Sequence, residues 1–99
     1  MIAIILILHS CFVFCKDDVW DKAKKIEGKD SKKYRQDAYN NVIYYNSYGK
    51  NTEKGWEIDH IVPKSRGGSN NIRNLQALKT SINRVKSNSK VKKSRHNQN

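Results

Sequence analysis

The stretch "WEIDHIVPKSRGG", Trp56 to Gly68, decides how the rest of this 99-residue sequence is interpreted. An apolar, strand-like run leads into an Asp–His pair, the only proline of the chain and a pair of glycines. Successive side chains of a strand point to opposite faces, so Asp59 and His60 are not expected to share one packed face. Pro63 cannot donate to a sheet ladder and is expected to end the strand. The pair is therefore either a functional site whose two side chains have separate roles on opposite faces, or simply the polar end of a strand.

The residues after this stretch predict a second strand and a helix. A loop rich in Gly, Ser and Asn comes first, and "LQALK" at 75–79 then predicts either a short strand or the entry to a helix. "TSINRVKSN" at 80–88 predicts a helix with Thr80 or Ser81 as its N-cap. Together with a strand at 56–61, this half of the chain is expected to be strand, long loop, strand and helix.

The residues before the stretch predict a helix and a hairpin. "KDDVWDKAKKIE" at 16–27 predicts a short helix, because acidic residues stand in its first turn and Gly28 can terminate it. A polar loop completes the segment 16–33. "YRQDAYNNVIYYN" at 34–46 predicts a hairpin whose tight turn is Asn40–Asn41. The five tyrosines are either packing residues at strand spacing, which β-propensity favours, or a stacking surface for nucleic acid.

The charge of the sequence indicates a polyanionic partner. Twenty Lys and Arg outnumber nine Asp and Glu, which gives a formal net charge of +11. Residues 16–83 carry 14 basic and 9 acidic side chains, and residues 84–99 carry 6 basic and none acidic. A basic body with a more basic end favours nucleic acid first and an anionic membrane second, against a merely solvated surface. The composition of residues 88–99 predicts a disordered basic tail.

The first fifteen residues, "MIAIILILHSCFVFC", are apolar apart from His9 and Ser10. They are shorter than the roughly 20 apolar residues of a membrane span, and they have neither a preceding Lys or Arg nor a following cleavage site of the A-x-A kind. Three interpretations stay open, namely an export signal or anchor, a buried helix or strand, and a displaced start codon. The chain is expected to be cytoplasmic or secreted depending on which holds.

Side-chain chemistry in residues 59–86 suits the hydrolysis of a phosphodiester. A neutral histidine such as His60 can take a proton from water. Asp59 offers a carboxylate and Asn83 a carbonyl oxygen, which are donors that a hard divalent cation prefers. Basic side chains stand nearby to contact phosphate. These predicted nucleic-acid-binding residues are Lys64, Arg66, Arg84 and Lys86.

The sequence from Glu57 to Asn88, "EIDHIVPKSRGGSNNIRNLQALKTSINRVKSN", resembles the motif of HNH endonucleases, the ββα-metal or His-Me finger nucleases. Their pattern is D-H-I-x-P, a Gly-containing loop, N-L-Q-x-L and a short helix with His or Asn before a basic residue. Asn74 lies 15 positions and Asn83 24 positions after Asp59, similar to the spacing in the family. The upstream segment 35–56 also resembles small bacterial and phage-type members, with Asn40 at a position where glycine is common.

The resemblance implies a role for each matched residue. His60 matches the general base, Asp59 and Asn83 match the metal ligands, and Asn74 matches the central Asn that pins the loop and orients the His backbone. Asn83 replaces the third-letter His, and it favours Mg²⁺, with Mn²⁺ as the alternative, over zinc. A structural zinc is not expected, because both cysteines lie in the first fifteen residues.

These observations predict a small α+β protein with an HNH nuclease domain at 34–87. Its fold is expected to be a ββα-metal finger preceded by a hairpin and an N-terminal helix. The predicted activity is metal-dependent cleavage of DNA, with RNA as the alternative substrate and no small-molecule cofactor. Two rival functions are a nucleic-acid-binding module that does not cut and a secreted or membrane-attached toxin domain. The oligomeric state and the substrate sequence are not determined by these residues.

Overall fold

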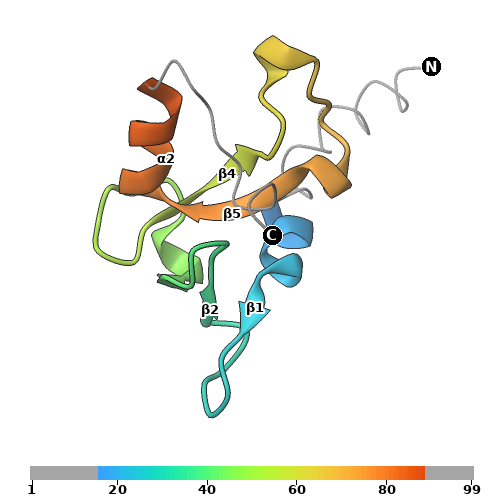
Figure 1. Cartoon of the computed structure of the whole chain (residues 1–99). Helices are drawn as coiled ribbons and strands as arrows, with labels where there is room; N and C mark the ends of the chain where they lie inside the picture. Colours follow the sequence, from blue (N-terminus) through green and yellow to red (C-terminus); the bar gives the residue numbers. More distant parts are fainter. Residues whose placement is uncertain (1–15, 89–99) are drawn as a thin grey trace, which may run out of the picture.

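A computed structural model describes residues 16–88 of the chain (Figure 1). The predicted apolar N-terminal segment and most of the predicted basic tail lie outside these residues. A helix at 16–22 precedes a three-stranded antiparallel sheet, and a two-stranded hairpin then leads into a second helix. The α+β class and the order of elements predicted from the sequence are confirmed. Within residues 16–88, no helix is long and apolar enough to cross a membrane.

The centre of the fold is an antiparallel hairpin of β4, Trp56–His60, and β5, Leu75–Lys79. In its register Asp59 stands opposite Gln76. The alternating strand places Trp56 and Ile58 on the face that meets the apolar core, and it places Asp59 on the other face. Residues 75–79 are therefore a strand and not the entry to a helix.

Helix α2, Thr80–Asn88, follows β5 directly and covers the second face of the hairpin (Figure 1). Its first residue, Thr80, is fully buried, and the Thr80 hydroxyl has no hydrogen-bond partner within residues 16–88. Thr80 therefore does not cap the helix through its side chain, although it was one of two expected N-caps. The backbone N–H of Thr80 instead donates to the Gly55 carbonyl, which ties the helix start to the beginning of β4.

The core lies on the opposite side of the hairpin from α2. Its buried members come from the helix at 16–22, from β3 and from both strands of the hairpin, and the indole rings of Trp20 and Trp56 lie 5.2 Å apart at its centre. The core residues are Val19, Trp20, Ile43, Trp56, Leu75 and Ala77. Residues 16–33 thus share one core with the predicted nuclease domain. The helix at 16–22 is further tied to β5 because Lys22 donates to the Leu75 carbonyl, and partial burial lowers the pKa of that ammonium.

The N-terminal helix is shorter than predicted, because part of the predicted span is a strand. Residues 16–22 are helical, whereas Lys24–Lys25 form β1 and pair with β2, Tyr34–Gln36. The buried Arg35 of β2 donates to the Asp21 and Ala23 carbonyls. These bonds satisfy carbonyls at the helix end, so the chain can turn and run along β2. The expected helix at 16–27 is wrong beyond residue 22.

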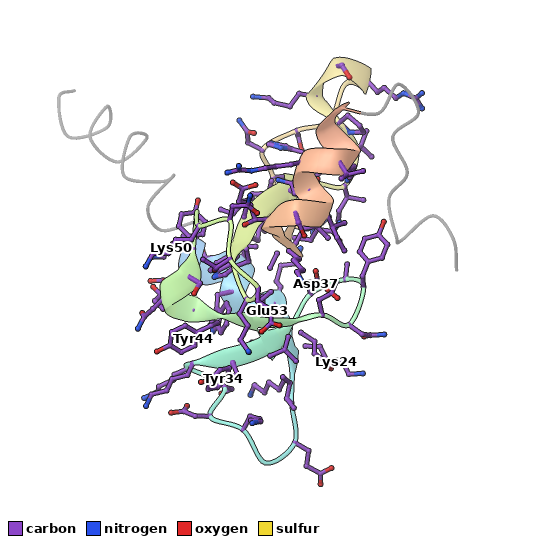
Figure 2. All side chains as sticks on the ribbon, turned by 90° about the vertical axis from the view of Figure 1, so that its left-hand side faces the viewer. Lys24, Tyr34, Asp37, Tyr44, Lys50 and Glu53 are labelled. Carbon is purple, nitrogen blue, oxygen red and sulfur yellow. The ribbon has the colours of Figure 1, made fainter. Side chains whose placement is uncertain are left out.

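The predicted hairpin at 34–46 is present as β2 and β3, Val42–Tyr44. Asn40 in its turn has φ 68°, a left-handed conformation that asparagine tolerates better than most residues. Tyr34 and Tyr44 stand opposite each other across the strands with ring centroids 5.1 Å apart (Figure 2). Tyr45 and Tyr48 pack against the core tryptophans. These four tyrosines are packing residues, as β-propensity favoured.

Asp37, at the end of β2, joins the two sheets. It is buried, and its carboxylate accepts hydrogen bonds from the backbone N–H groups of Tyr39, Asn41 and Lys79. The Lys79 bond spans 42 positions of sequence, so one carboxylate orders the hairpin turn and anchors it to the end of β5. Removing it would leave several backbone donors without their partner.

We predict that Asp37→Ala lowers the free energy of unfolding by about 3 kcal/mol, because buried donors lose a charged acceptor. Urea unfolding followed by tryptophan fluorescence measures this loss. Asp30→Ala is the matched control, since Asp30 is exposed and its carboxylate accepts one local N–H, from Lys32. Equal losses in the two variants would contradict the anchoring role of Asp37.

Candidate active site

A polar cavity of about 310 Å³ opens between the end of β4, the following loop and α2. It brings together the predicted base, His60, and the two predicted metal ligands, Asp59 and Asn83. Two of the predicted nucleic-acid-binding residues, Lys64 and Lys86, also line it. The full lining is Ile58, Asp59, His60, Pro63, Lys64, Ser65, Asn83 and Lys86. Asp59 and His60 are consecutive in a strand, yet both border this one cavity because it lies at the strand end.

Asp59 is buried, with 6% of its surface exposed. Gln76 donates to its Oδ2 at 2.7 Å from the opposite strand, and Lys86 donates to the same oxygen at 2.6 Å from α2. Both hydrogen bonds that the described part of the chain makes to this carboxylate therefore end on Oδ2. Oδ1 is the oxygen that remains for another donor or a cation.

Lys86 forms the closest ion pair of the site. Its side chain is 9% exposed, and the ammonium also donates to the backbone carbonyl of His60 at 3.3 Å. Lys86 was predicted to contact phosphate, but its ammonium instead pairs with Asp59 inside the site. A buried carboxylate needs a nearby positive charge, and Lys86 supplies that charge to Asp59.

His60 borders the cavity at the last position of β4. Its Nε2 lies 2.8 Å from Oδ1 of Asn70, a loop residue ten positions later. The ring is half-buried and faces a space large enough for water. An imidazole in this setting can take up a proton from a water molecule in the cavity.

Asn74 holds the loop between β4 and β5 closed at both ends. Its Oδ1 accepts from the Val62 N–H at 2.8 Å, and its Nδ2 donates to the carbonyls of Val62 and Ser69 at 3.1 and 2.8 Å. The Asn74 carbonyl also accepts from the N–H of Ile61, the residue after His60. One side chain thus fixes the backbone that follows the histidine, which is the position expected for it.

The glycine pair is required by the shape of the same loop. Gly67 has φ 89° and ends a short 3₁₀ turn, Lys64–Arg66. A Cβ on Gly68 would lie 1.7 Å from the Val62 carbonyl oxygen, so no side chain fits there. The loop consequently folds back on itself and keeps the turn with Lys64 at the cavity wall.

Asn83 reaches the cavity from α2. Its Nδ2 donates to Glu57 of β4 at 3.1 Å, so the carbonyl end of the amide is the end that can serve as an oxygen donor. Arg84, the next residue, lies 3.5 Å from the other carboxylate oxygen of Glu57 and is half-exposed. Glu57 therefore orients Asn83 while Arg84 stays near solvent.

The remaining predicted binding residues, Lys64 and Arg66, are exposed on the 3₁₀ turn of the loop. Within the described residues neither forms an ion pair, so both charges are available to an anion. Together with Arg84 they place basic side chains on two elements that surround the cavity. Lys86 differs from them because its ammonium already forms an ion pair with Asp59.

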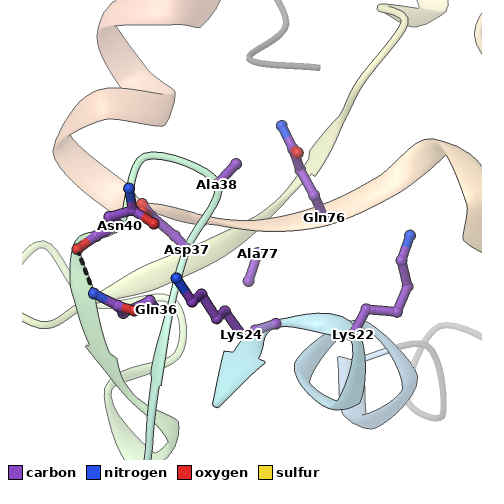
Figure 3. Close-up of a pocket in the computed structure, with 9 residues that line it drawn as sticks. Lys22, Lys24, Gln36, Asp37, Ala38, Asn40, Gln76 and Ala77 are labelled. Carbon is purple, nitrogen blue, oxygen red and sulfur yellow. Dashed lines mark hydrogen bonds between the residues drawn. The ribbon is translucent and has the colours of Figure 1, made fainter. Parts of the chain in front are cut away.

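A second cavity, of about 260 Å³, lies on the other side of β5 (Figure 3). It is lined by Lys22 and Ala23 at the end of the first helix, by residues of β1, β2 and the turn at 37–41, and by Gln76 and Ala77. Asp59, His60 and Asn83 do not border it. Gln76 is shared between this cavity and the site, since its amide also donates to Asp59.

The donor set of the first cavity fits a hard divalent cation. Asp59 and Asn83 offer a carboxylate and a carbonyl oxygen, which Mg²⁺ and Mn²⁺ accept together with water. Within residues 16–88, no group of three or more His, Cys, Asp or Glu residues comes together as a metal site. A cation held by Asp59 and Asn83 would have its remaining positions open to water and substrate.

Three residues of the site carried no role in the sequence analysis. Gln76 stands within N-L-Q, but only the register reveals that it faces Asp59. Glu57 lies two positions before Asp59, so strand alternation alone was sufficient to place both on one face of the strand. Nothing in the sequence indicated a role for Asn70, because its contact with His60 depends on how the loop folds.

The hairpin and the helix together form a ββα unit, and this cavity lies at the end of β4 beside α2. Residues 47–89 match the family model described as HNH endonuclease. The match covers somewhat less than half of the sequence and contains every residue of the cavity. It indicates a nuclease-type protein whose substrate is nucleic acid. Neither a search of curated proteins nor one of solved structures found a match.

We predict that Lys86→Met lowers the free energy of unfolding by about 3 kcal/mol, because it leaves a buried carboxylate without its counter-charge. Arg84→Met is the matched control on the same helix, and it is expected to lose less than about 1 kcal/mol because its ion pair is solvent-exposed. Urea unfolding followed by tryptophan fluorescence measures both variants. In the double variant Asp59→Asn with Lys86→Met much of the loss is expected to be recovered; no recovery would contradict the charge explanation.

Proposed function

We propose that this protein is a metal-dependent endonuclease that hydrolyses phosphodiester bonds in DNA. The observation that carries the proposal is the convergence of Asp59, His60 and Asn83 on one cavity within the HNH segment. A base, a carboxylate and an amide oxygen are the groups that metal-assisted hydrolysis of a phosphodiester needs. The excess of basic side chains in the chain supports a polyanionic substrate.

His60 acts as the general base in this proposal. It takes the proton of a water molecule in the cavity, and the water oxygen then forms a bond to phosphorus. The bond from phosphorus to the leaving oxygen breaks, and the leaving oxygen departs with that electron pair and takes a proton from solvent. Asp59 and Asn83 would hold the divalent cation from β4 and α2. Bound there, a Mg²⁺-like ion would supply positive charge for the phosphate and for the leaving oxygen.

The neighbours of these residues keep them in place. Lys86 and Gln76 hold Oδ2 of Asp59, so this carboxylate would offer Oδ1 to the cation. Glu57 holds the amide nitrogen of Asn83, so the carbonyl oxygen is presented. Such outer partners orient metal ligands and commonly contribute 10- to 100-fold to affinity or activity. Lys64, Arg66 and Arg84 would contact phosphates of the substrate strand.

We predict that the 99-residue protein nicks supercoiled plasmid DNA with Mg²⁺ or Mn²⁺ and that chelation of the metal stops the reaction. His60→Ala is expected to reduce the rate by at least about 100-fold, because a general base contributes that much. The measurement is the initial rate of nicking on gels. Asp30→Asn, a change in an exposed turn, serves as the control and is expected to keep the parent rate. His60→Ala cutting as fast as the parent would contradict the mechanism.

The same assay separates the proposed enzyme from a binding module that does not cut. A module of that kind would bind DNA with affinity falling steeply as salt rises, and it would show no metal-dependent turnover. Comparing plasmid DNA with an RNA of similar length in the same reaction determines which nucleic acid is the substrate. Cleavage of RNA alone would contradict the proposal for DNA.

We also predict that Asp59→Asn and Asn83→Ala each weaken Mn²⁺ binding at least about tenfold, because each removes an oxygen donor or its charge. Titration calorimetry without nucleic acid measures the affinity independently of cleavage. Asp59→Asn keeps a hydrogen-bonding group beside Lys86, and far-ultraviolet circular dichroism verifies that each variant is folded. Unchanged affinity in both variants would place the metal elsewhere in the chain.

A further inference from the structure

Positive charge within residues 16–88 is concentrated in two separate segments. Residues 24–33, "KKIEGKDSKK", carry five lysines and two acidic residues, whereas 16–23 has two lysines and three aspartates and 34–59 has three basic and four acidic residues. The second basic segment is 60–88, which has no acidic residue and contains the basic residues around the cavity. We call residues 24–33 the basic arm. Its excess of charge is not explained by the candidate active site.

The basic arm is a hairpin that runs from β1 through a turn to the start of β2 (Figure 1). In Figure 1 and Figure 2 it projects from one end of the described structure, whereas the 3₁₀ turn Lys64–Arg66 beside the cavity lies at the other end. The arm is also outside residues 47–89, which match the HNH family model. A nucleic acid bound at the cavity would therefore have to continue along the molecule to reach the arm.

Side chains of the body hold the arm in place. The Ser31 carbonyl accepts from Trp20 Nε1 at 3.0 Å and from Arg35 Nε at 2.9 Å, and both donor residues are buried. The Lys33 carbonyl accepts from the Tyr45 N–H at 2.8 Å. A hairpin tied to the core in this way presents its side chains from a fixed backbone, which reduces the entropy lost when a partner binds.

Most lysines of the arm have unpaired ammonium groups. Lys29 lies over the ring of Tyr34, with 5.5 Å between its Nζ and the ring centroid. The other four are exposed, and within residues 16–88 their side chains form no ion pair and no hydrogen bond. These four are Lys24, Lys25, Lys32 and Lys33. Their charges are available to an anionic partner.

The composition of the arm favours nucleic acid over an anionic membrane. Surfaces that bind membranes commonly add apolar side chains to their positive charge, because these side chains insert at the lipid boundary. The large apolar residue of the arm is Ile26, and it is half-buried. Closely spaced lysines on a polar hairpin instead suit the regularly spaced phosphates of a nucleic-acid backbone.

We propose that the basic arm is a second nucleic-acid contact, which binds backbone phosphates away from the cavity and contributes affinity without taking part in bond cleavage. The inference goes beyond the proposed nuclease chemistry, because phosphate binding by the arm requires neither a metal nor His60. Contacts to phosphates carry no sequence information, so the arm binds DNA of any sequence. Each phosphate that a lysine neutralises releases counterions, so the arm makes binding more dependent on salt.

The salt dependence of DNA binding measures the contribution of the arm. A fluorescent duplex of about 30 base pairs is titrated without divalent metal, so that no strand is cut, and anisotropy gives Kd at several salt concentrations. We predict that Lys32→Gln with Lys33→Gln weakens binding at least about threefold and lowers the slope of log Kd against log salt by at least about 1. Lys32→Arg with Lys33→Arg keeps both charges and is expected to keep the parent slope.

Lys50→Gln with Lys54→Gln is the matched control. Both lysines are exposed in the segment that precedes β4, so this variant removes the same charge from another part of the chain. It is expected to change the slope less than half as much as the arm variant. Equal changes in the two variants would show an effect of net charge alone and would overturn the role of the arm. An unchanged slope in a folded arm variant, verified by far-ultraviolet circular dichroism, would overturn it as well.

Binding to vesicles tests the rival partner. The parent and the arm variant are mixed with vesicles of phosphatidylserine and phosphatidylcholine, and sedimentation measures the bound fraction. We expect the arm variant to lose more affinity for DNA than for the vesicles. Loss of vesicle binding without any loss of DNA binding would overturn the assignment of the arm to nucleic acid.

Cleavage kinetics separate this inference from the proposed function. In plasmid nicking, the arm variant Lys32→Gln with Lys33→Gln is expected to raise KM at least about threefold with kcat unchanged, because it removes binding that is equal in the ground and transition states. A parent that binds DNA through the arm but cuts no nucleic acid would contradict the nuclease function and leave the role of the arm intact. A parent that cuts DNA, with an arm variant that binds DNA equally well, would overturn the role of the arm alone.

Discussion

The antiparallel pairing of β4 with β5 is the constraint on which the rest of the structure depends. Its register sets Asp59 opposite Gln76, and alternation along each strand then separates an apolar face from a polar one. The apolar face carries Trp56 into the core, while the polar face is covered by α2. A shift of the register by one residue would exchange the two faces, so core and site are specified by the same backbone hydrogen bonds.

The polar face of the hairpin carries a buried charge, which a small domain tolerates only if other groups pair with it. Asp59 is buried, and a buried carboxylate is costly unless it is paired and hydrogen-bonded. Lys86 and Gln76 supply both requirements through the same oxygen. The result is a carboxylate that is stable without a metal and still has one oxygen at the cavity. Stability and the proposed metal chemistry therefore share Asp59 without competing for the same atom.

The loop between the two strands organises the histidine. Gly68 permits the close approach of the loop to the Val62 carbonyl, and Asn74 closes it with hydrogen bonds at both ends. Closure brings Asn70 against the imidazole of His60. A loop that is rich in Gly, Ser and Asn thus has a defined shape, because its side chains replace the backbone pairing that a strand would have provided.

The sequence by itself determined the order of the main elements and the turn at Asn40, because these depend on local periodicity. It also determined which polar residues to single out, at positions 59, 74 and 83, because that choice depends on spacing along the chain. It did not determine that residues 24–25 leave the helix, since that follows from β2 and from Arg35, which is distant in sequence. Nor did it distinguish Lys86 from Lys64. Both look like phosphate-binding lysines, and only tertiary structure buries one beside Asp59 and leaves the other exposed. Local rules predict which groups are present, whereas partners and burial depend on contacts between segments that are far apart in the chain.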